Sequence, residues 1–415
     1  MRTDIDVVVV GAGVGGSAIA AALARNGIKT LLLERTAEHY DRIRGEYLAP
    51  WGVAETQKLG LYSDLIAAGG HHTKLAIPYS EGVSPEMARN RAIDLTSAYP
   101  GVLGGLCMQH VVTCNTLNRS AQQAGAEIIR PAERIEVTAG IAPEVRFLHD
   151  GQAHHTRCHL VVGADGRGSS VARQARISFR KDPPHHLLTG LLVEGVEDWP
   201  EDIQSVGVEG DVMFFVFPQG SGRARLYLGF GREQSRRFTG PGSANRFLEA
   251  FRLRCVPSSE ILAAGKPIGH CQSYPNEDMW CDEPVAPGIV LIGDAAGHND
   301  PTIGQGLAIT FRDARFVSEI LLNEKIWAKE AFRPYVEERA ERMKRLRFVG
   351  RLVSTLRAEF DQRARVRRQL VAERLVKEPS LALPLRATIH GPEALPAEAF
   401  EQRAWDQLMG ERAVH

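Results

Sequence analysis

The sequence predicts an α/β fold that contains a Rossmann-like domain, an inserted antiparallel β-sheet domain and a helical C-terminal region. Three observations predict this fold. A strand, a glycine-rich turn and a helix start follow one another near the N-terminus. Two later apolar runs end in Gly-Ala-Asp-Gly and Gly-Asp-Ala-Ala, and the stretch between these two motifs alternates as antiparallel strands do. The 415 residues are enough for two domains.

The first motif is a glycine-rich turn between an apolar run at 7–10 and an alanine-rich helical stretch. Its sequence is Gly11-Ala12-Gly13-Val14-Gly15-Gly16. Gly11 permits the turn, Gly13 lets the backbone approach a pyrophosphate, and Gly16 lets the helix pack close to the strand. We expect the pyrophosphate at the helix N-terminus, because free N–H groups and the helix dipole favour negative charge there.

The second apolar run, at 31–33, completes the βαβ unit and ends in Glu34. An acid at this position meets the 2′-hydroxyl of an adenosine ribose. Arg35, the next residue, is predicted to contact the same cofactor. Because FAD and NAD share this fingerprint, the first motif predicts a dinucleotide and leaves open which one.

The two later motifs each follow a buried strand. The strand at 160–163 runs into Asp165 and Arg167, and the strand at 289–292 runs into Asp294. We expect Asp294 to offer its carboxylate to a sugar-like hydroxyl. Further along the third motif, Gly304-Gln305-Gly306 opens a helix. The amides at its N-terminus can stabilise a developing anion, and reduced flavin is such an anion.

Together, the three motifs resemble those of the group A flavoprotein monooxygenases, the single-component aromatic hydroxylases with the fold of 4-hydroxybenzoate hydroxylase. The resemblance implies an FAD-binding domain of the glutathione reductase type, with NADPH or NADH and O2 as co-substrates. By analogy, Asp165 and Arg167 lie near both FAD and the nicotinamide cofactor. Arg44 and Gln109 match positions that contact the flavin in the family.

The resemblance implies a monooxygenase that inserts one oxygen atom from O2 into an aromatic or polyketide-like small molecule through a C4a-hydroperoxyflavin. His298, Pro301 and Gly304 are the expected catalytic residues. The third motif departs from the hydroxylase pattern at Gly297 and Asp300. Epoxidation, Baeyer–Villiger insertion, halogenation and prenyl-chain reduction therefore stay open, as does a flavoprotein that binds a hydrophobic metabolite without turnover. Halogenation is disfavoured because residues 212–218 lack both tryptophans of the halogenase motif.

The stretches at 187–195, 205–217 and 224–230 predict a meander of antiparallel strands that roofs the flavin ring. Its aromatic residues Phe214, Phe215 and Phe217, with Trp280, are candidates for the substrate pocket. After the third motif the chain is helical. Interleaved acidic residues in the basic stretch 332–375 predict a solvated face with salt bridges rather than a nucleic-acid site.

The predicted domains are discontinuous along the chain. Residues 1–75, 101–180 and 278–325 form the FAD-binding domain, and residues 76–100 and 181–277 form the substrate-binding β-sheet domain. Residues 326–415 form the C-terminal helical region, and its final, proline-containing stretch from Pro379 onward could cover the active site or pack a homodimer.

Composition excludes several classes of partner. Fifty basic and fifty acidic residues cancel, so no net field attracts nucleic acid or an anionic membrane. No apolar run is long enough to span a bilayer, and the N-terminus shows no export signal, which predicts a cytoplasmic protein. The six cysteines and the histidine pairs at 71–72 and 154–155 lack metal-ligand spacing, so we expect no metal.

Overall fold

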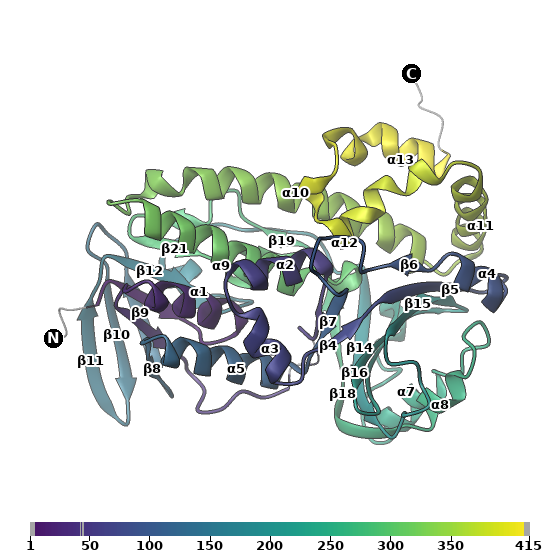
Figure 1. The fold of residues 1–415 in the computed structure, drawn as a ribbon, viewed down its shortest axis with the longest axis horizontal. Helices are drawn as coiled ribbons and strands as arrows, with labels where there is room; N and C mark the ends of the chain where they lie inside the picture. Colours follow the sequence, from purple (N-terminus) through teal and green to yellow (C-terminus); the bar gives the residue numbers. More distant parts are fainter. Residues whose placement is uncertain (1–4, 42, 44, 411–415) are drawn as a thin grey trace.

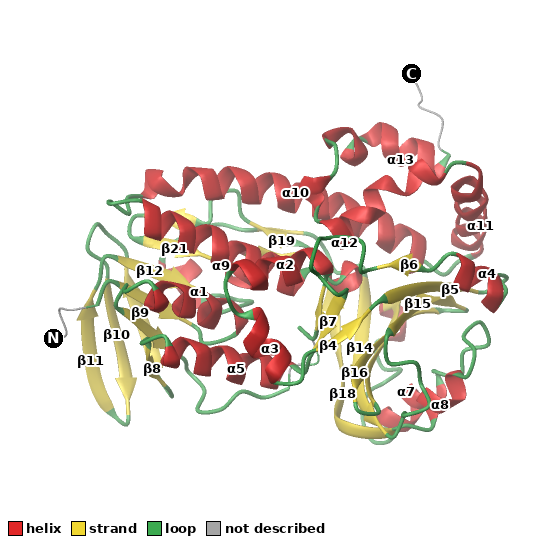
Figure 2. Ribbon diagram, viewed as in Figure 1, coloured by secondary structure: helices red, strands yellow, loops and turns green. Residues whose placement is uncertain are grey.

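Two sheets lie toward opposite ends of the molecule, and the long helix α10 (Arg333–Arg357) runs above both (Figures 1 and 2). The computed structural model describes residues 5–41, 43 and 45–410. The predicted α/β fold class is confirmed. Within the described part of the chain, no helix combines the length and the apolar character needed to cross a membrane.

The first sheet has six strands, in the order β20-β21-β12-β1-β2-β8. The five strands from β21 to β8 all pair in parallel. The edge strand β20 is antiparallel to β21. The strands are β1 (Val7–Val10), β2 (Thr30–Leu33), β8 (Glu127–Ile129), β12 (Leu160–Gly163), β20 (Val285–Ala286) and β21 (Ile289–Leu291). The register pairs Val10 with Gly163 on one side and with Leu33 on the other, so all three predicted motifs leave the same edge of this sheet.

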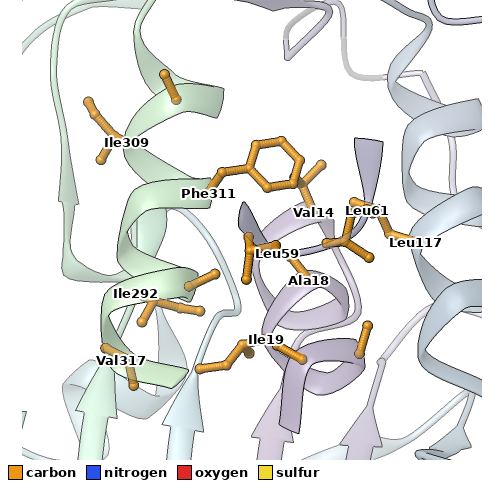
Figure 3. Close-up of a cluster of buried hydrophobic side chains, with 14 of the residues drawn as sticks. Val14, Ala18, Ile19, Leu59, Leu61, Leu117, Ile292, Ile309, Phe311 and Val317 are labelled. Carbon is orange, nitrogen blue, oxygen red and sulfur yellow. The ribbon is translucent and has the colours of Figure 1, made fainter. Parts of the chain in front are cut away.

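Each face of this sheet is covered, which is why its strands are almost wholly apolar. On one face lie the helices α1 (Val14–Arg25), α5 (His110–Gln123) and α9 (Gly306–Asn323), and their core includes Ile19, Leu117 and Phe311 (Figure 3). On the other face lies an antiparallel sheet of β9 (Glu133–Thr138), β10 (Glu144–His149) and β11 (Gln152–Arg157).

The second sheet has seven strands in the order β18-β14-β17-β16-β15-β5-β6. Only β5 and β15 pair in parallel. The strands are β5 (Leu75–Ser80), β6 (Ile93–Asp94), β14 (His186–Glu194), β15 (Ile203–Glu209), β16 (Val212–Gly220), β17 (Arg223–Gly231) and β18 (Lys266–Asn276). The apolar stretch 205–217 is two strands and not one, because the chain turns at Gly210, whose φ of 60° suits glycine.

Shorter elements connect and flank the two sheets. The strands β3 (Tyr47–Leu48), β7 (Gly105–Cys107) and β4 (His71–Thr73) form one small sheet, and β13 (Arg180–Lys181), β19 (Met279–Trp280) and β22 (Gly297–His298) form another. The helices are α2 (Pro50–Lys58), α3 (Tyr62–Ala67), α4 (Pro85–Asn90), α6 (Ser170–Gln174), α7 (Ser243–Glu249) and α8 (Ser259–Ala263). The stretch 106–124 begins with residues of strand β7 and becomes helical only at His110.

The C-terminal region is helical, and its helices α11 (Gln362–Lys377), α12 (Ala387–His390) and α13 (Gln402–Met409) gather around the C-terminal half of α10 (Figure 1). The prediction of a solvated basic face is wrong for part of α10. Arg339 and Arg342 are each 2% exposed, because they pair with the buried Asp313 of α9. Other basic residues of α10, such as Lys344, do form exposed pairs.

Candidate functional site

A single cavity of about 2450 Å³ connects the predicted motifs with the second sheet. Pockets that hold one small molecule measure about 300–1,000 Å³, so this cavity is large enough for more than one. Most sequence-predicted site residues line it: Gly11, Gly13, Glu34, Arg35, Asp165, Arg167, Asp294, His298, Pro301, Gly304, Gln305, Gly306, Phe215 and Phe217.

The remaining predicted residues lie elsewhere. Gly16 is buried beneath the first turn, and Gln109 is the N-cap of α5, where its neighbour His110 reaches the cavity wall instead. Trp280 lies under the guanidinium of Arg347, 4.5 Å from the ring centroid. Arg44 lies outside the described residues.

The glycines of the first motif are required for two different reasons. Gly11 has a φ of 103°, and a Cβ at Gly16 would lie 1.8 Å from the Gly11 carbonyl oxygen. The fold itself therefore demands both. A Cβ at Gly13 would meet no atom within 4 Å. Gly13 is also the N-cap of α1 and provides no side-chain cap, so the first amides of α1 face the cavity without a protein acceptor from that residue.

Glu34, which ends β2, holds the glycine turn in place. Its Oε2 accepts a hydrogen bond from the Ala12 N–H at 2.9 Å. Its Oε1 accepts from the N–H and the hydroxyl of Thr36, at 3.0 and 2.8 Å. Although burial alone would raise the pKa of Glu34, these hydrogen bonds lower it. The carboxylate is thus charged, and it lies at the cavity wall beside the exposed Arg35.

Asp165 in the second motif uses its carboxylate within its own turn. Oδ2 accepts from the Ser170 N–H at 2.7 Å and from the Ser170 hydroxyl at 2.9 Å, and Oδ1 accepts from the Ser169 hydroxyl at 2.5 Å. Asp165 therefore fixes the start of α6. Arg167, two residues on, donates from Nε to Asp294 Oδ2 at 3.2 Å, and this ion pair joins the second motif to the third.

In the third motif the chain passes through two short 3-10 turns before α9 begins. Gly304 separates the second turn from α9 and has a φ of 65°, which glycine adopts without strain. A Cβ there would also lie 3.2 Å from the Tyr47 ring. Gly306, the first residue of α9, needs no such conformation, and a Cβ on it would meet no atom within 4 Å. Gly306 at the start of α9 and Gly13 at the start of α1 therefore share one property: a side chain on either would meet open space.

The side chain of Gln305 is engaged in hydrogen bonds within the protein. Its Oε1 accepts from the Trp51 indole N–H at 2.7 Å, and its Nε2 donates to the carbonyls of Ile303 and Thr388, at 2.6 and 3.1 Å. Gln305 is 1% exposed. Only the backbone of this residue is therefore available to a ligand, while its side chain connects α9 to α2 and α12.

Buried charges of α10 clamp the loop of the third motif from behind. Asp313 Oδ2 accepts from the Gly293 N–H at 2.8 Å and from Arg339 Nε at 3.0 Å. Arg339 also donates to the carbonyls of Gly293 and Gly297, at 3.3 and 3.0 Å. Arg342 donates to Asp313 Oδ1 at 2.6 Å. The loop that carries Asp294 is held by these fixed charges, which the sequence pattern of α10 did not reveal.

A buried polar network adjoins the cavity at Thr302. The Nε2 of His186, a fully buried residue, lies 2.8 Å from the Thr302 hydroxyl and 2.7 Å from Asn276 Nδ2. The Thr302 N–H and hydroxyl both donate to Asp300, and the Asp300 N–H donates to Asp278 at 3.0 Å. Burial raises the pKa of Asp278 to about 7, and the Asp300 carboxylate adds to this increase. Burial lowers the pKa of His186.

Two of the predicted catalytic residues flank this network. His298 is 5% exposed and lies in β22, opposite Met279 of β19. Pro301 opens the 3-10 turn that also contains Thr302, and both line the cavity. Neither Asn276 nor Asp278 belongs to a recognisable motif, so sequence inspection missed the network.

The second sheet supplies an aromatic wall. Phe215 and Phe217 of β16 point to the cavity, and the Phe217 ring stacks on Tyr47 at 5.0 Å between centroids. Tyr227 of β17 meets the edge of Phe217 at 6.1 Å. The prediction that Phe214 lines the pocket does not agree with its position. Successive strand side chains point to opposite faces, and Phe214 is fully buried in the core on the far side.

A buried arginine joins this wall to the segment before β3. Arg225 is 1% exposed and donates to Glu46 Oε1 at 2.6 Å and to Asp41 Oδ2 at 2.8 Å. Burial by itself would lower the pKa of Arg225, but the nearby carboxylates raise it. The hydroxyl of Tyr227 donates to Glu46 Oε2 at 2.9 Å. Both ends of the segment 41–46 are therefore fixed to the sheet.

Comparison with known proteins is consistent with this geometry. The family model described as "FAD binding domain" matches residues 4–347. Digeranylgeranylglycerophospholipid reductase 2 of Methanopyrus kandleri is 30% identical over 334 residues, which is 76% of each chain. Squalene epoxidase erg1 of Aspergillus fumigatus is 25% identical over 77% of this chain and 67% of its own length.

A solved structure, p-nitrophenol 4-monooxygenase PnpA of Pseudomonas putida, superposes over the full length of both chains. Its TM-score is 0.77 and its sequence is 17% identical. At this level of identity the likeness shows a shared fold.

Proposed function

The chain belongs to the FAD binding domain family, and on that premise we propose that it is an FAD-dependent, NAD(P)H-consuming monooxygenase. The proposed reaction inserts one oxygen atom from O2 into an aromatic or polyketide-like small molecule. The resemblance of the three motifs to group A hydroxylases supports this choice within the family, and so does the shared fold with a nitrophenol monooxygenase.

One observation carries the proposal: two helices begin at the same cavity with glycines that the fold does not require. Neither Gly13 nor Gly306 needs a positive φ, and a Cβ on either would meet no protein atom within 4 Å. A bound group is a physical reason to leave such space empty. FAD fits it, because its pyrophosphate and its electron-rich ring are each stabilised by amides at a helix N-terminus.

Different residues of the cavity would bind different parts of FAD. The first turn of α1 would hold the pyrophosphate, and Glu34 with Arg35 would border the adenosine end. Asp294, held by the clamped loop and oriented by Arg167, would bind a hydroxyl of the ribityl chain. The first amides of α9 would face the ring.

When bound, FAD supplies hydride acceptance and oxygen activation. The chain contributes binding, orientation and exclusion of water. The stacked Tyr47 and Phe217, with Phe215, form a dry wall suited to an aromatic substrate. The buried network reaches the cavity at the Thr302 hydroxyl, and the carboxyl group of Asp278, whose pKa is raised, can hold a proton behind the cavity wall.

A second candidate function is epoxidation or reduction of a prenyl chain. The cavity favours it in one respect, because beyond the aromatic wall it continues between the C-terminal helices along Leu356, Leu375 and Leu385. Two relatives are named for prenyl lipids, a geranylgeranyl lipid reductase and a squalene epoxidase.

The test measures three things on one protein preparation: the bound FAD, the rate of NADPH or NADH oxidation, and the product. We expect the purified protein to contain FAD and to oxidise NADPH or NADH faster when the correct phenol, quinolone or polyketide-like aromatic is added. Under ¹⁸O2 the product gains one labelled oxygen. Label from water instead, or a substrate that gains two hydrogens and no oxygen, would reject the monooxygenase, and the second of these outcomes would select prenyl-chain reduction.

A further inference from the structure

The cavity extends from the aromatic wall to the C-terminal helices. Ala358 and Phe360, in the link between α10 and α11, pack against the apolar cluster that includes Phe215 and Phe217. Leucines of α10, α11 and the segment before α12 line the same cavity. This part of the cavity, which we call the C-terminal arm, therefore has an apolar side, and charged residues such as Glu373, Lys377 and Arg386 also line it.

Several cations line the C-terminal arm, among them Arg357, Lys377 and Arg386. Arg357, in the last turn of α10, lines the cavity. Burial lowers the pKa of Arg357, and no carboxylate offsets that effect. No hydrogen bond or ion pair joins its guanidinium to another residue within the ranges 5–41, 43 and 45–410. The guanidinium still has accessible surface, because it faces the cavity and not the packed core.

The three arginines that are buried in the described part of the chain each pair with a carboxylate. Arg225 pairs with Glu46 and Asp41, while Arg339 and Arg342 share Asp313. A buried charge without a partner is costly, and proteins pair such charges or neutralise them. The dipole of α10 favours a cation at its C-terminus, but that effect is small beside the cost of desolvation.

The neighbouring cations on α11 are already paired. Arg365 and Arg368 lie 3.6 and 3.8 Å from Glu81, which follows β5. These pairs join α11 to the turn after β5, while Arg357 lines the cavity beside Ala358, which packs against the aromatic cluster. An arginine in an apolar recess suits a planar anion, which it can bind through two hydrogen bonds.

We propose that Arg357 binds the anionic group of an otherwise apolar substrate, such as a carboxylate on an aromatic or alkyl skeleton. This inference rests on the proposed function, because it places the substrate of that reaction. The apolar body of the molecule lies against the aromatic wall and the leucines of the C-terminal arm. The nicotinamide cofactor is the other source of an anion, and the experiment separates the two.

The experiment is a titration of the FAD-loaded protein with a matched pair of probes, 4-octylbenzoate and 4-octylbenzyl alcohol. The two share a skeleton and differ in charge at neutral pH. Calorimetry should show the benzoate binding about ten- to a hundredfold more tightly than the alcohol, as a charged hydrogen-bonded pair provides. Arg357→Met, which keeps an unbranched side chain but removes the charge, should abolish that preference, and Arg357→Lys should keep part of it.

Arg363→Met is the matched control, because Arg363 is exposed on α11 and outside the cavity wall. It should keep the full preference for the benzoate. Arg357→Met should unfold at the same temperature as the wild type or higher, since it removes a partly buried charge that no carboxylate offsets. A lower unfolding temperature would assign Arg357 to the fold and overturn the proposal.

Two further outcomes contradict the proposal. One is equal affinity of the wild type for both probes. The other is a normal probe preference in Arg357→Met together with weaker binding of NADPH, which would assign the guanidinium to the nicotinamide cofactor. The outcome that would contradict the proposed function is a different one. A protein that prefers the benzoate but never oxygenates a substrate would support the anion site and contradict the monooxygenase proposal.

Discussion

The two ends of the cavity are built from different parts of the chain. At the end near the first sheet, backbone amides and glycines at the starts of α1 and α9 face the cavity, together with the carboxylates of Glu34 and Asp294, which come directly after strands. At the other end the cavity is lined by side chains, with Phe215 and Phe217 from one strand and Arg357 from a helix far along the chain. The comparison teaches that a site made of backbone leaves a contiguous motif, whereas a site made of side chains leaves none.

The largest expected effect separates fold from ligand within the first motif. Gly16→Ala should lower the free energy of unfolding by about 3 kcal/mol or more, because its Cβ would collide with the Gly11 carbonyl. Gly13→Ala should change the free energy by less than about 1 kcal/mol and weaken FAD at least about tenfold. Denaturant unfolding and flavin titration measure the two quantities. If Gly13→Ala binds FAD normally, the open space at Gly13 does not serve the pyrophosphate.

The next effect tests a side chain at the backbone-built end. Asp294→Ala should weaken FAD about ten- to a hundredfold, since a charged hydrogen bond contributes roughly 1.5–3 kcal/mol. Asp282→Ala is the control, because Asp282 forms an exposed pair with Arg180. Flavin content after purification and a titration of the apo protein compare them. Equal flavin retention in both variants would remove Asp294 from the cofactor site.

A smaller effect concerns the polar network that adjoins the cavity between the two ends. Burial raises the pKa of Asp278 to about 7, above the value near 4 of an unfolded chain. The folded state then holds a proton that the unfolded state has lost, so the contribution of Asp278 to stability is present below about pH 4 and disappears as the pH rises through 7. The slope is at most about 1.4 kcal/mol per pH unit.

Thermal unfolding of the wild type and of Asp278→Asn across this pH range measures the effect. The variant keeps an oxygen that can accept from the Asp300 N–H but cannot titrate. As the pH rises from 4 to 7, the wild type should lose stability that the variant keeps. The unfolding temperature of the variant should therefore rise relative to that of the wild type. Parallel curves would show that Asp278 ionises as in the unfolded chain.

The smallest effect distinguishes the two faces of β16 at the side-chain end. Phe215→Leu should weaken the alkylbenzoate probe about two- to tenfold, as expected for an aromatic contact, with little change in stability. Phe214→Leu should lower stability by about 1 kcal/mol and leave probe binding unchanged, because Phe214 lies in the core behind the sheet. Reversed results would place the substrate on the opposite face.

The sequence determined the features that depend on neighbours along the chain. The turn at Gly11, the strand before Asp294 and the helix after Gly306 were all predicted from local pattern, because glycine geometry and strand burial are local properties. These features sufficed to indicate the family and the α/β fold. They also placed Glu34 and Asp294 at one cavity.

Only the tertiary structure decided which side chains face the ligand and which serve the fold. Asp165 and Gln305 belong to predicted motifs, yet their side chains hold α6 and join α9 to α2 and α12. Phe214 and Phe215 are adjacent, but the register of β16 sends them to opposite faces. Arg339 and Arg357 lie on one basic helix, and only packing gives the first a buried carboxylate and the second a cavity. Burial and partners come from residues distant in sequence, so no local pattern encodes them.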